Sequence, residues 1–419
     1  MTDEGTEAVD HRLDAEHLEF GGGLEILLAA ALERVAPGGV LEIRTGSRAV
    51  ALEMPGWARL TGHELIGESD RRGASVLKIR RGSSRRVLAD PLPARGAPER
   101  LRAGGELHTA DWRGGGPPPE PRPGAGFAPL GAVPEAGAPE RHWRLSDSDA
   151  LWADDVGDLV EQASAQQWDA SRDVPWEAAR ELDDTTERAV AQVMTFLAQN
   201  EYAALYVPAG FLPHVNPQLT ELVLWLGSHV HDEARHIEVF TKRSLVGGYR
   251  GYALASTELS LHTLLEEHDF TASSLLLNVL GEGTFLDLLR FIERRAPDAA
   301  TAAAARLAHR DERRHVHFGI SNIRRAMSRD PGLSEVLVAA AEARAAKLVS
   351  LSGLSPILVE ALTVMAAASL QPAEIAEAAG EVRALMARME RNRLRRLAAC
   401  GFSDVTARHL SDLHTPNLM

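Results

Sequence analysis

The sequence predicts a mainly helical protein: a small α/β domain, a linker rich in proline and glycine, and a four-helix bundle with extra C-terminal helices. Three observations support this prediction. Residues 13–90 alternate helical and strand-like runs. Residues 91–142 contain 11 Pro and 10 Gly, a composition that interrupts regular structure. Apolar side chains recur at helical spacing over residues 145–332, and more helical segments, separated by Pro and Gly, follow over 333–419.

Composition narrows the class of protein. The chain of 419 residues has a net charge of −14 and a single cysteine, Cys400. Its acidic balance disfavours nucleic acid or an anionic membrane as a partner. One cysteine excludes an intramolecular disulfide and a cysteine-rich zinc site. The acidic N-terminus does not look like a signal peptide, and no uncharged apolar run reaches membrane-spanning length, so we expect a cytoplasmic protein.

The first domain is expected to combine short helices and strands, after a loose polar segment at residues 1–12. Its expected elements are a helix from Leu24 to Val35, strands at Val40–Ile43 and Ala49–Leu52, a short helix from Pro55 to Leu65, and a hairpin of Val76–Ile79 and Arg86–Leu88. We interpret residues 91–142 as a mostly disordered linker with some polyproline II. A proline-rich ligand for a partner domain is the alternative.

Capping signals delimit the long helices that follow. The expected bundle helices run from Asp184 to about Tyr206, from Asn216-Pro217 to Gly247-Gly248, from Thr257 to Arg295, and from Pro297-Asp298 to the residue before Pro331. Pro208 and Pro213 mark the first loop between them. Further helices are expected at 334–350, 356–369, 372–399 and 403–412.

Two nearly identical segments carry the strongest functional signal. They are Asp232-Glu233-Ala234-Arg235-His236 and Asp311-Glu312-Arg313-Arg314-His315. Each contains Glu-x-x-His, and residues i and i+3 lie on one face of a helix, so that a carboxylate and an imidazole converge. One such pair arises easily by chance, whereas two copies of the longer motif do not.

The helix before each motif supplies a further glutamate. Glu201 and Glu282 both have apolar neighbours at helical spacing, for example Leu197 and Leu205 around Glu201. Folding two antiparallel helix pairs together puts four Glu and two His at the bundle centre, which is the ligand set of ferritin-like two-metal bundles. The predicted metal ligands are Glu201, Glu233, His236, Glu282, Glu312 and His315.

Two cations would offset the repulsion and the desolvation cost of four buried carboxylates. A carboxylate-rich set without thiolates favours iron or manganese over structural zinc, so we expect two Fe, with a Mn/Fe pair as the alternative. Exposed helical charges paired at i, i+3 are the simpler interpretation of the same residues.

Residues next to the predicted ligands are also repeated. Asp232 and Asp311 are candidates to accept a hydrogen bond from the metal-bound histidine of the opposite motif. Arg235 and Arg314 would then hold the two aspartates. Ordinary ion pairs on the helix surface are the alternative.

Other side chains near the motifs have two interpretations each. His229 and His309 are candidate extra ligands, although a histidine at such a position is more often a supporting or solvent-facing group. Tyr202, Tyr206 and Trp225 can carry electrons or a radical, but core packing is the favoured interpretation.

The paired motifs, with Glu201 and Glu282, resemble those of the di-iron hydroxylase subunits of bacterial multicomponent monooxygenases and of related ferritin-like oxygenases. The resemblance covers residues 201–315. It implies a ferritin-like bundle, a di-iron centre and O2 as co-substrate. In the N-oxygenase branch of these proteins an extra histidine lies four residues before the last Glu-x-x-His, where this chain has Ala308.

Residues 13–90 resemble a TusA-type sulfur-carrier domain, on the segments 31–43 and 54–65. The active Cys-Pro-x-Pro of that family falls on Gly21-Gly22-Gly23-Leu24 in this chain. The resemblance therefore implies a degenerate carrier without persulfide chemistry, kept as a docking or regulatory module.

We expect an O2-activating oxygenase or oxidase that oxidises a small organic substrate through a peroxo or higher-valent di-iron state. Glu201 and Glu282 are the expected catalytic residues, as carboxylates that shift coordination when O2 binds. Electrons are expected from a separate reductase or ferredoxin, because no flavin or iron–sulfur motif is visible. The alternatives are an iron protein without an organic substrate, for storage, ferroxidase activity or peroxide scavenging, and a scaffold with a structural metal. A homodimer is left open, and neither nucleic acid nor membrane is an expected partner.

Overall fold

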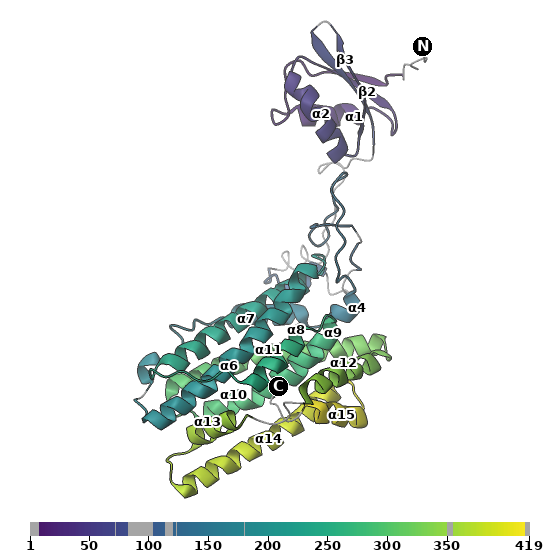
Figure 1. Ribbon diagram of the computed structural model, residues 1–419. Helices are drawn as coiled ribbons and strands as arrows, with labels where there is room; N and C mark the ends of the chain where they lie inside the picture. The colour runs from purple at the N-terminus through teal and green to yellow at the C-terminus, as the bar shows by residue number, and fades with distance from the viewer. Residues whose placement is uncertain are drawn as a thin grey trace. The chain divides into compact units, whose positions relative to one another are not determined.

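The computed structural model describes residues 8–71, 73–82, 104–113, 120–122, 124–179, 181–349 and 355–414. The chain forms two compact units (Figure 1), namely Met1–Ala94 with Arg122–His142, and Arg95–Pro121 with Trp143–Met419. The segment expected to link two domains is thus divided between the units. Thr109, for example, donates hydrogen bonds from its amide and its hydroxyl to Glu161 of the helical unit.

The first unit is a four-stranded sheet with two helices against it. The strand order is β1-β2-β4-β3: β1 (His11–Asp14) is parallel to β2 (Val40–Thr45), and β4 (Ala74–Arg80) is antiparallel to both β2 and β3 (Glu64–Arg71). The helices are α1 (Leu24–Leu32) and α2 (Arg48–Leu60). They share one buried core with the sheet residues Leu41, Ile43, Leu77 and Ile79.

Three expectations for this unit are wrong. Ala49–Leu52 is part of α2, because Ser47 caps a helix there: its Oγ accepts a hydrogen bond from the Ala49 amide at 3.2 Å. The helix expected to reach Leu65 ends at Leu60, and β3 starts after a turn at Gly62 (φ 72°). The residues expected to be loose include His11 and Arg12, which begin β1, and the pairing of β1 with β2 joins segments far apart in sequence. The expected strand at 86–88 lies outside the described residues.

Four long helical segments form the bundle of the second unit, as the sequence predicted. They are α6 (Asp184–Phe211), α7 (Thr220–Leu245), the continuous pair η4 (Ser274–Glu282) and α10 (Gly283–Arg295), and α11 (Ala299–Arg329). Their apolar faces share one buried core. The fold class is confirmed: a mainly helical protein with a four-helix bundle, extra C-terminal helices and a small N-terminal sheet.

Local chemistry explains where these helices begin and end. The carboxylate of Asp183 accepts hydrogen bonds from the amides of Thr185 and Thr186 at 3.0 and 3.1 Å, which starts α6. This helix continues through Pro208 to Phe211, beyond its expected end, because a proline in the last turns removes only one of the remaining backbone hydrogen bonds.

The single helix expected from Thr257 to Arg295 is wrong. α8 (Ala255–Leu265) ends before Asp269, whose Oδ1 accepts a hydrogen bond from the Ala272 amide at 2.7 Å and so starts a new helix. α9 (Phe270–Ser273) leads directly into the π-helical turns of η4. In a π-helix the backbone hydrogen bonds join residues i and i+5, so its side chains are spaced differently from those of an α-helix.

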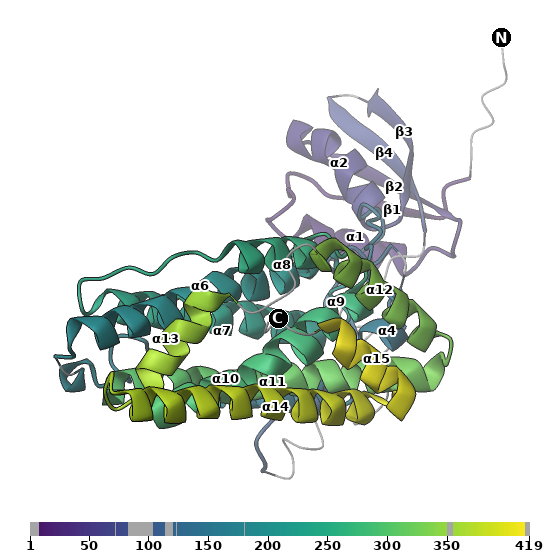
Figure 2. The same ribbon diagram turned by 60° about the horizontal axis from the view of Figure 1, so that its bottom comes forward.

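Further helices surround the bundle. Those that follow it are α12 (Leu333–Leu348), α13 (Pro356–Ala366), α14 (Pro372–Cys400) and α15 (Asp404–His414), close to their expected positions. Short segments precede or connect the bundle helices, namely η1 (Thr109–Arg113), α4 (Ser148–Leu151), α5 (Val156–Ala165), η2 (Trp176–Ala178) and η3 (Leu212–His214). Figure 2 shows α14 lengthwise beside α10 and α11, while α13 contacts α6. Within the described part of the chain, every helix is too short or too polar to cross a membrane.

A buried ion-pair network ties three bundle helices together. Arg243 of α7 is fully buried and donates hydrogen bonds to Glu187 of α6 at 2.6 Å and to Asp298, the cap of α11, at 2.8 Å. Its Nε donates to Thr301 at 2.5 Å. Removing one partner from such a pair typically costs about 3–5 kcal/mol, so this network fixes the alignment of the helices that carry the site.

Candidate metal centre

All six predicted ligands converge at the centre of the bundle. Glu201 comes from α6, Glu233 and His236 from α7, Glu282 from the last turn of η4, and Glu312 and His315 from α11. None of the six is more than 5% exposed. The alternative that these residues form exposed helical ion pairs is therefore wrong.

The polar atoms gather in two overlapping groups. The first cluster is Glu201, Glu233, His236 and Glu312, and the second cluster is His229, Glu233, Glu282 and His315. Within each cluster one candidate ligand atom per residue lies within 4.8 Å of the others, and Glu233 belongs to both. This geometry fits two metal ions that share a carboxylate.

Several of these atoms have no hydrogen bond, which tests whether the residues fit a metal. Glu201 Oε1, Glu233 Oε1 and both carboxylate oxygens of Glu312 are buried and unsatisfied, as is His315 Nδ1. Each unsatisfied buried group costs about 1–3 kcal/mol. A cation between them would satisfy them together, so the donor set fits a metal centre.

The two histidines of the motifs are oriented alike. Nδ1 faces the carboxylates in both: it lies 3.1 Å from Glu233 Oε2 in His236, and 2.9 Å from Glu233 Oε1 in His315. The opposite nitrogen, Nε2, lies 3.4 Å from Asp311 in His236 and 3.3 Å from Asp232 in His315. Nδ1 is thus the nitrogen available to a metal, while Nε2–H can donate to an aspartate.

The aspartate and the arginine of each motif contact residues of the other motif, which is the arrangement that the sequence predicted. Asp232 faces the histidine of the second motif and Asp311 that of the first. Arg314 bridges both carboxylates, with its Nη2 at 2.8 Å from Asp232 and 2.7 Å from Asp311. Arg235 also contacts both aspartates, at 3.1 Å from Asp311. All four side chains are buried, so the surface ion-pair alternative is wrong for them.

Sequence reasoning missed the residues that hold this network from outside. Trp168 Nε1 donates to Asp311 at 2.6 Å, and Gln166 Oε1 accepts from Arg314 at 2.9 Å. Gln167 accepts from Arg235. These three consecutive residues follow α5, about 65 positions before the first motif in sequence, and no local pattern links them to the site.

His229 joins the second cluster, whereas His309 joins neither cluster among the described residues. His229 Nε2 lies 3.1 Å from Glu282 and 3.4 Å from Glu233, and its ring stacks on that of His315 with centroids 3.8 Å apart. His309 is half-buried; burial, and then the charges of Arg290 and Arg313, lower its pKa.

Asn278 is a second site residue that sequence reasoning missed. Its Nδ2 donates to Glu282 Oε2 at 2.8 Å from one turn earlier in η4. Gly319 of α11 permits this arrangement, because a Cβ atom there would lie 2.6 Å from the Cβ of Asn278. The only sequence signal is a polar side chain on an otherwise apolar segment.

The aromatic candidates divide between core and surface. Trp225 is fully buried and makes an edge contact with His315 at 5.9 Å, which confirms core packing for it. Tyr202 and Tyr206 are 47% and 52% exposed. The expectation of core packing is wrong for both tyrosines, because they lie on the outer face of α6.

The pKa values of the buried groups at this site are strongly perturbed. Burial, and then Glu233 and Glu312, raise the pKa of Glu201 well above its usual range. Burial also raises the pKa of Glu282. For His236 burial lowers the pKa, but the charge of Glu233 and hydrogen bonds to Asp311 and Glu233 outweigh it and raise the pKa well above its usual range. All three pKa values are thus raised, and perturbed pKa values of buried groups are typical of functional sites.

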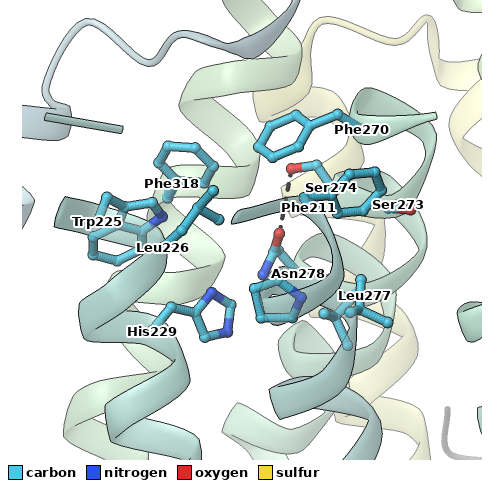
Figure 3. A pocket seen from close by; sticks show the side chains of 12 residues that line it. Phe211, Trp225, Leu226, His229, Phe270, Ser273, Ser274, Leu277, Asn278 and Phe318 are labelled. Atoms are coloured by element: carbon cyan, nitrogen blue, oxygen red, sulfur yellow. Dashed lines mark hydrogen bonds between the residues drawn. The ribbon is translucent and has the colours of Figure 1, made fainter. Parts of the chain in front are cut away.

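Two small cavities flank the clusters. One of about 20 Å³ is lined by Glu201, Glu282 and Glu312 on one side and Arg344 on the other. The second, also about 20 Å³, lies beside His229. Figure 3 shows His229, Trp225 and Asn278 around it, with Phe211 and Phe270 farther out. Each has room for about one water-sized molecule.

Fold and site together define a class: a helical bundle with a buried carboxylate–histidine centre that fits two metal ions. No protein-family model and no curated relative matches the chain. Among solved structures, a variant of an R2-like ligand-binding oxidase with an aerobically reconstituted Mn/Fe cofactor has a TM-score of 0.41 and 15% identity, covering 60% of this chain and 92% of that chain. A second variant of that oxidase has a TM-score of 0.43 and 17% identity, covering 56% and 92%.

Proposed function

We propose that this protein is an O2-activating oxidase or oxygenase for a small organic substrate. Its two metal ions, iron or a manganese–iron pair, are held by Glu201, Glu233, His236, Glu282, Glu312 and His315, with His229 as a seventh ligand. The observation that carries this proposal is the pair of buried clusters that share Glu233. Oxygen donors with a few imidazoles are the ligands that iron and manganese accept readily.

When bound, the metals would supply the electrons and the Lewis acidity for O2 chemistry. The chain's own residues hold them in place. Asp311 and Asp232 orient His236 and His315 through Nε2. Among the described residues Glu201 Oε1 has no hydrogen-bond partner, so this oxygen is available to a metal.

The surroundings provide space for reactants and exclude bulk water. The cavity beside His229 shares the wall residues Val207 and Phe211 with a third cavity of about 260 Å³, which Tyr206 and His268 also line. The third cavity is large enough for part of a small organic molecule. A site closed in this way protects reactive states from water.

Iron storage is the alternative function. It requires many ions to pass through the site to a mineral, whereas every ligand is buried and the adjoining cavities hold about one water-sized molecule each. Those two features favour oxidation of a substrate.

The test uses the full chain, loaded with Fe(II) without oxygen and then mixed with O2. We expect saturation at about two metals per chain and, with a panel of small molecules, a product with one more oxygen or two fewer hydrogens. Glu282→Ala should remove turnover while circular dichroism stays unchanged, and His309→Ala should behave like the parent. Conversion of many irons per chain to ferric mineral, without an organic product, would overturn the proposal in favour of storage.

A further inference from the structure

A second buried polar cluster lies where the C-terminal helices cover the bundle. It contains Arg344 of α12, Arg393 and Arg396 of α14, and His414 of α15. Arg344 is 7% exposed, Arg393 is 3% exposed, and the side chain of Arg396 is 11% exposed. Guanidinium groups are seldom buried without anionic partners, because desolvation of a charge is costly.

Direct ion pairs to these arginines are few among the described residues. Arg344 donates only to hydroxyls, from Nε to Thr263 at 3.0 Å and from Nη2 to Ser260 at 2.7 Å. Its Nη1 has no hydrogen bond, and no carboxylate lies within ion-pair distance of it, among the residues that the structure describes. A buried charge with donors left over is an incomplete site.

The α14 arginines show the same deficit. Arg393 Nε donates to the Ser411 hydroxyl at 2.9 Å. Arg396 has one carboxylate nearby, Asp287 at 3.7 Å, and its Nε and Nη2 have no hydrogen-bond partner. Asp287 is thus an ion-pair partner for one of the three guanidinium groups, that of Arg396. Burial lowers the pKa of Arg393, and the charges of Glu390 and Asp412 act on it in the opposite direction.

The electrostatics of the neighbouring groups agree with an excess of positive charge. Burial, and then Arg393, Arg344 and Arg396, lower the pKa of His414 well below its usual range. Burial alone lowers the pKa of Arg344 to about 10, so the group keeps its charge at neutral pH. The cluster is thus cationic under ordinary conditions.

This cluster adjoins the metal centre. Arg344 lines the same cavity as Glu201, Glu282 and Glu312. Arg396 lies against Gly283, the residue after Glu282: a Cβ atom at position 283 would come within 2.5 Å of Arg396 Nε. An anion held by Arg344 would therefore lie beside the carboxylates of the clusters.

We propose that the arginine cluster binds the anionic group of the substrate, a carboxylate or a phosphate ester, with Arg344 as the contact residue. Arg393 and Arg396 are positioning residues that supply additional positive charge. This inference rests on the proposed function, because it assigns a substrate class to that site. A small organic anion would be anchored at Arg344 with its uncharged part toward the metals, which requires the cavity of about 20 Å³ to widen on binding.

Anion binding is measured on the full-length protein by titration calorimetry, with acetate and inorganic phosphate as separate probes. The titrations are done without O2, once with Fe(II) bound and once metal-free. We expect one of the two probes to bind, and Arg344→Gln to weaken its binding about tenfold or more, the usual effect of losing a charged hydrogen bond. Arg344→Lys should retain part of the affinity, and Arg383→Gln, at an exposed position of α14, should leave it unchanged.

The probe that binds identifies the anion class. Absence of binding of both probes by the folded parent, or equal affinity in Arg344→Gln and the parent, would overturn the proposal. If Arg344→Gln does not fold, the affinities of Arg344→Lys and Arg396→Gln are compared with that of the parent. Equal affinity in the parent and both variants would then overturn the proposal. The binding measurement uses neither O2 nor turnover. Anion binding could therefore be confirmed even if the proposed oxidation failed, and the oxidation could be confirmed even if no anion bound.

Discussion

The two clusters of the metal centre derive from a repeated sequence pattern, yet they are not equivalent. The first cluster has three carboxylates and one histidine, whereas the second has two carboxylates and two histidines. Glu201 of the first cluster lies on a regular α-helix and has a free oxygen, while Glu282 of the second lies in a π-helix and is held by Asn278 and His229. A sequence repeat therefore predicts which residues converge, but not that the two metal positions are alike.

The difference can be traced to one position in each motif. His229 lies four residues before Glu233, and the equivalent position before Glu312 is Ala308, which is buried against the core. The added imidazole thus belongs to α7, not to α11. We expect the two positions to bind metal with different affinities.

The largest expected effect is the loss of metal from both clusters in a double variant. His236→Ala combined with His315→Ala deletes the nitrogen donor of the first cluster and one of the two in the second. Metal analysis of protein grown with iron should find about two metals per chain in the parent and almost none in the double variant. Full iron loading of a folded double variant would show that the clusters are not the metal site.

A single substitution should separate the clusters. His229→Ala removes a ligand only from the second, so one of the two metals should be lost at limiting iron while the other stays bound. Competition with a chelator should reveal one site weakened roughly tenfold or more. His309→Ala is the matched control, and equal weakening of both sites by His229→Ala would contradict the asymmetry.

Changes in the network around the ligands should have smaller effects. Asp311→Asn keeps the size of the side chain but removes the charge that Trp168, Arg235 and Arg314 bind. Loss of such an outer partner typically weakens metal affinity about 10–100-fold, and here the loss should fall mainly on the first cluster through His236. Asp232→Asn should act mainly on the second cluster, through His315.

The pH dependence of metal binding follows from the raised pKa values. In the metal-free protein Glu201, Glu282, His236 and His315 all hold their protons to higher pH than usual. A metal must displace those protons, so affinity should fall as pH falls and binding should release protons. Calorimetry in buffers of different ionisation enthalpy measures the release. Affinity that rises toward low pH would contradict this sign.

The smallest expected effect is on the chemical reactivity of the single cysteine, Cys400. Burial raises the pKa of Cys400 to about 12, and its side chain is inaccessible within the helical unit. Native protein should therefore react slowly with a thiol reagent at pH 8 and accept no persulfide from a cysteine desulfurase. Transfer of labelled sulfur to the native chain would contradict the prediction that this protein carries no persulfide.

The sequence was informative where function depends on short-range helical spacing. The i, i+3 pairs and the two glutamates that precede them predicted six side chains that the structure brings together. It was uninformative where partners come from distant segments. Trp168 and Arg344 reach the site from outside the bundle, and nothing in their local sequence signals it.

Periodicity also failed at two kinds of boundary. The break before Asp269 lies in the polar run Glu266-Glu267-His268-Asp269, where the Asp269 cap starts a new helix. The π-helix after it lies in a mainly apolar stretch, where a helix of either type has the same composition. In the first unit, the apolar pattern of Ala49–Leu52 is typical of a strand, but the N-cap at Ser47 starts a helix there. Local hydrogen-bonding side chains outweighed the apolar pattern in both cases.

The π-helical segment has a consequence for how this chain tolerates insertions and deletions. Each residue of an α-helix turns the following side chains by about 100°. Deleting one residue between Leu275 and Gly281 would allow the segment to return to an ordinary α-helix. A π-helical turn contains about one residue more than an α-helical turn, so Glu282 and α10 would then keep nearly the same orientation relative to the preceding turns. A deletion of one residue here should thus be tolerated better than a deletion within α10, which would turn the following side chains by about 100°.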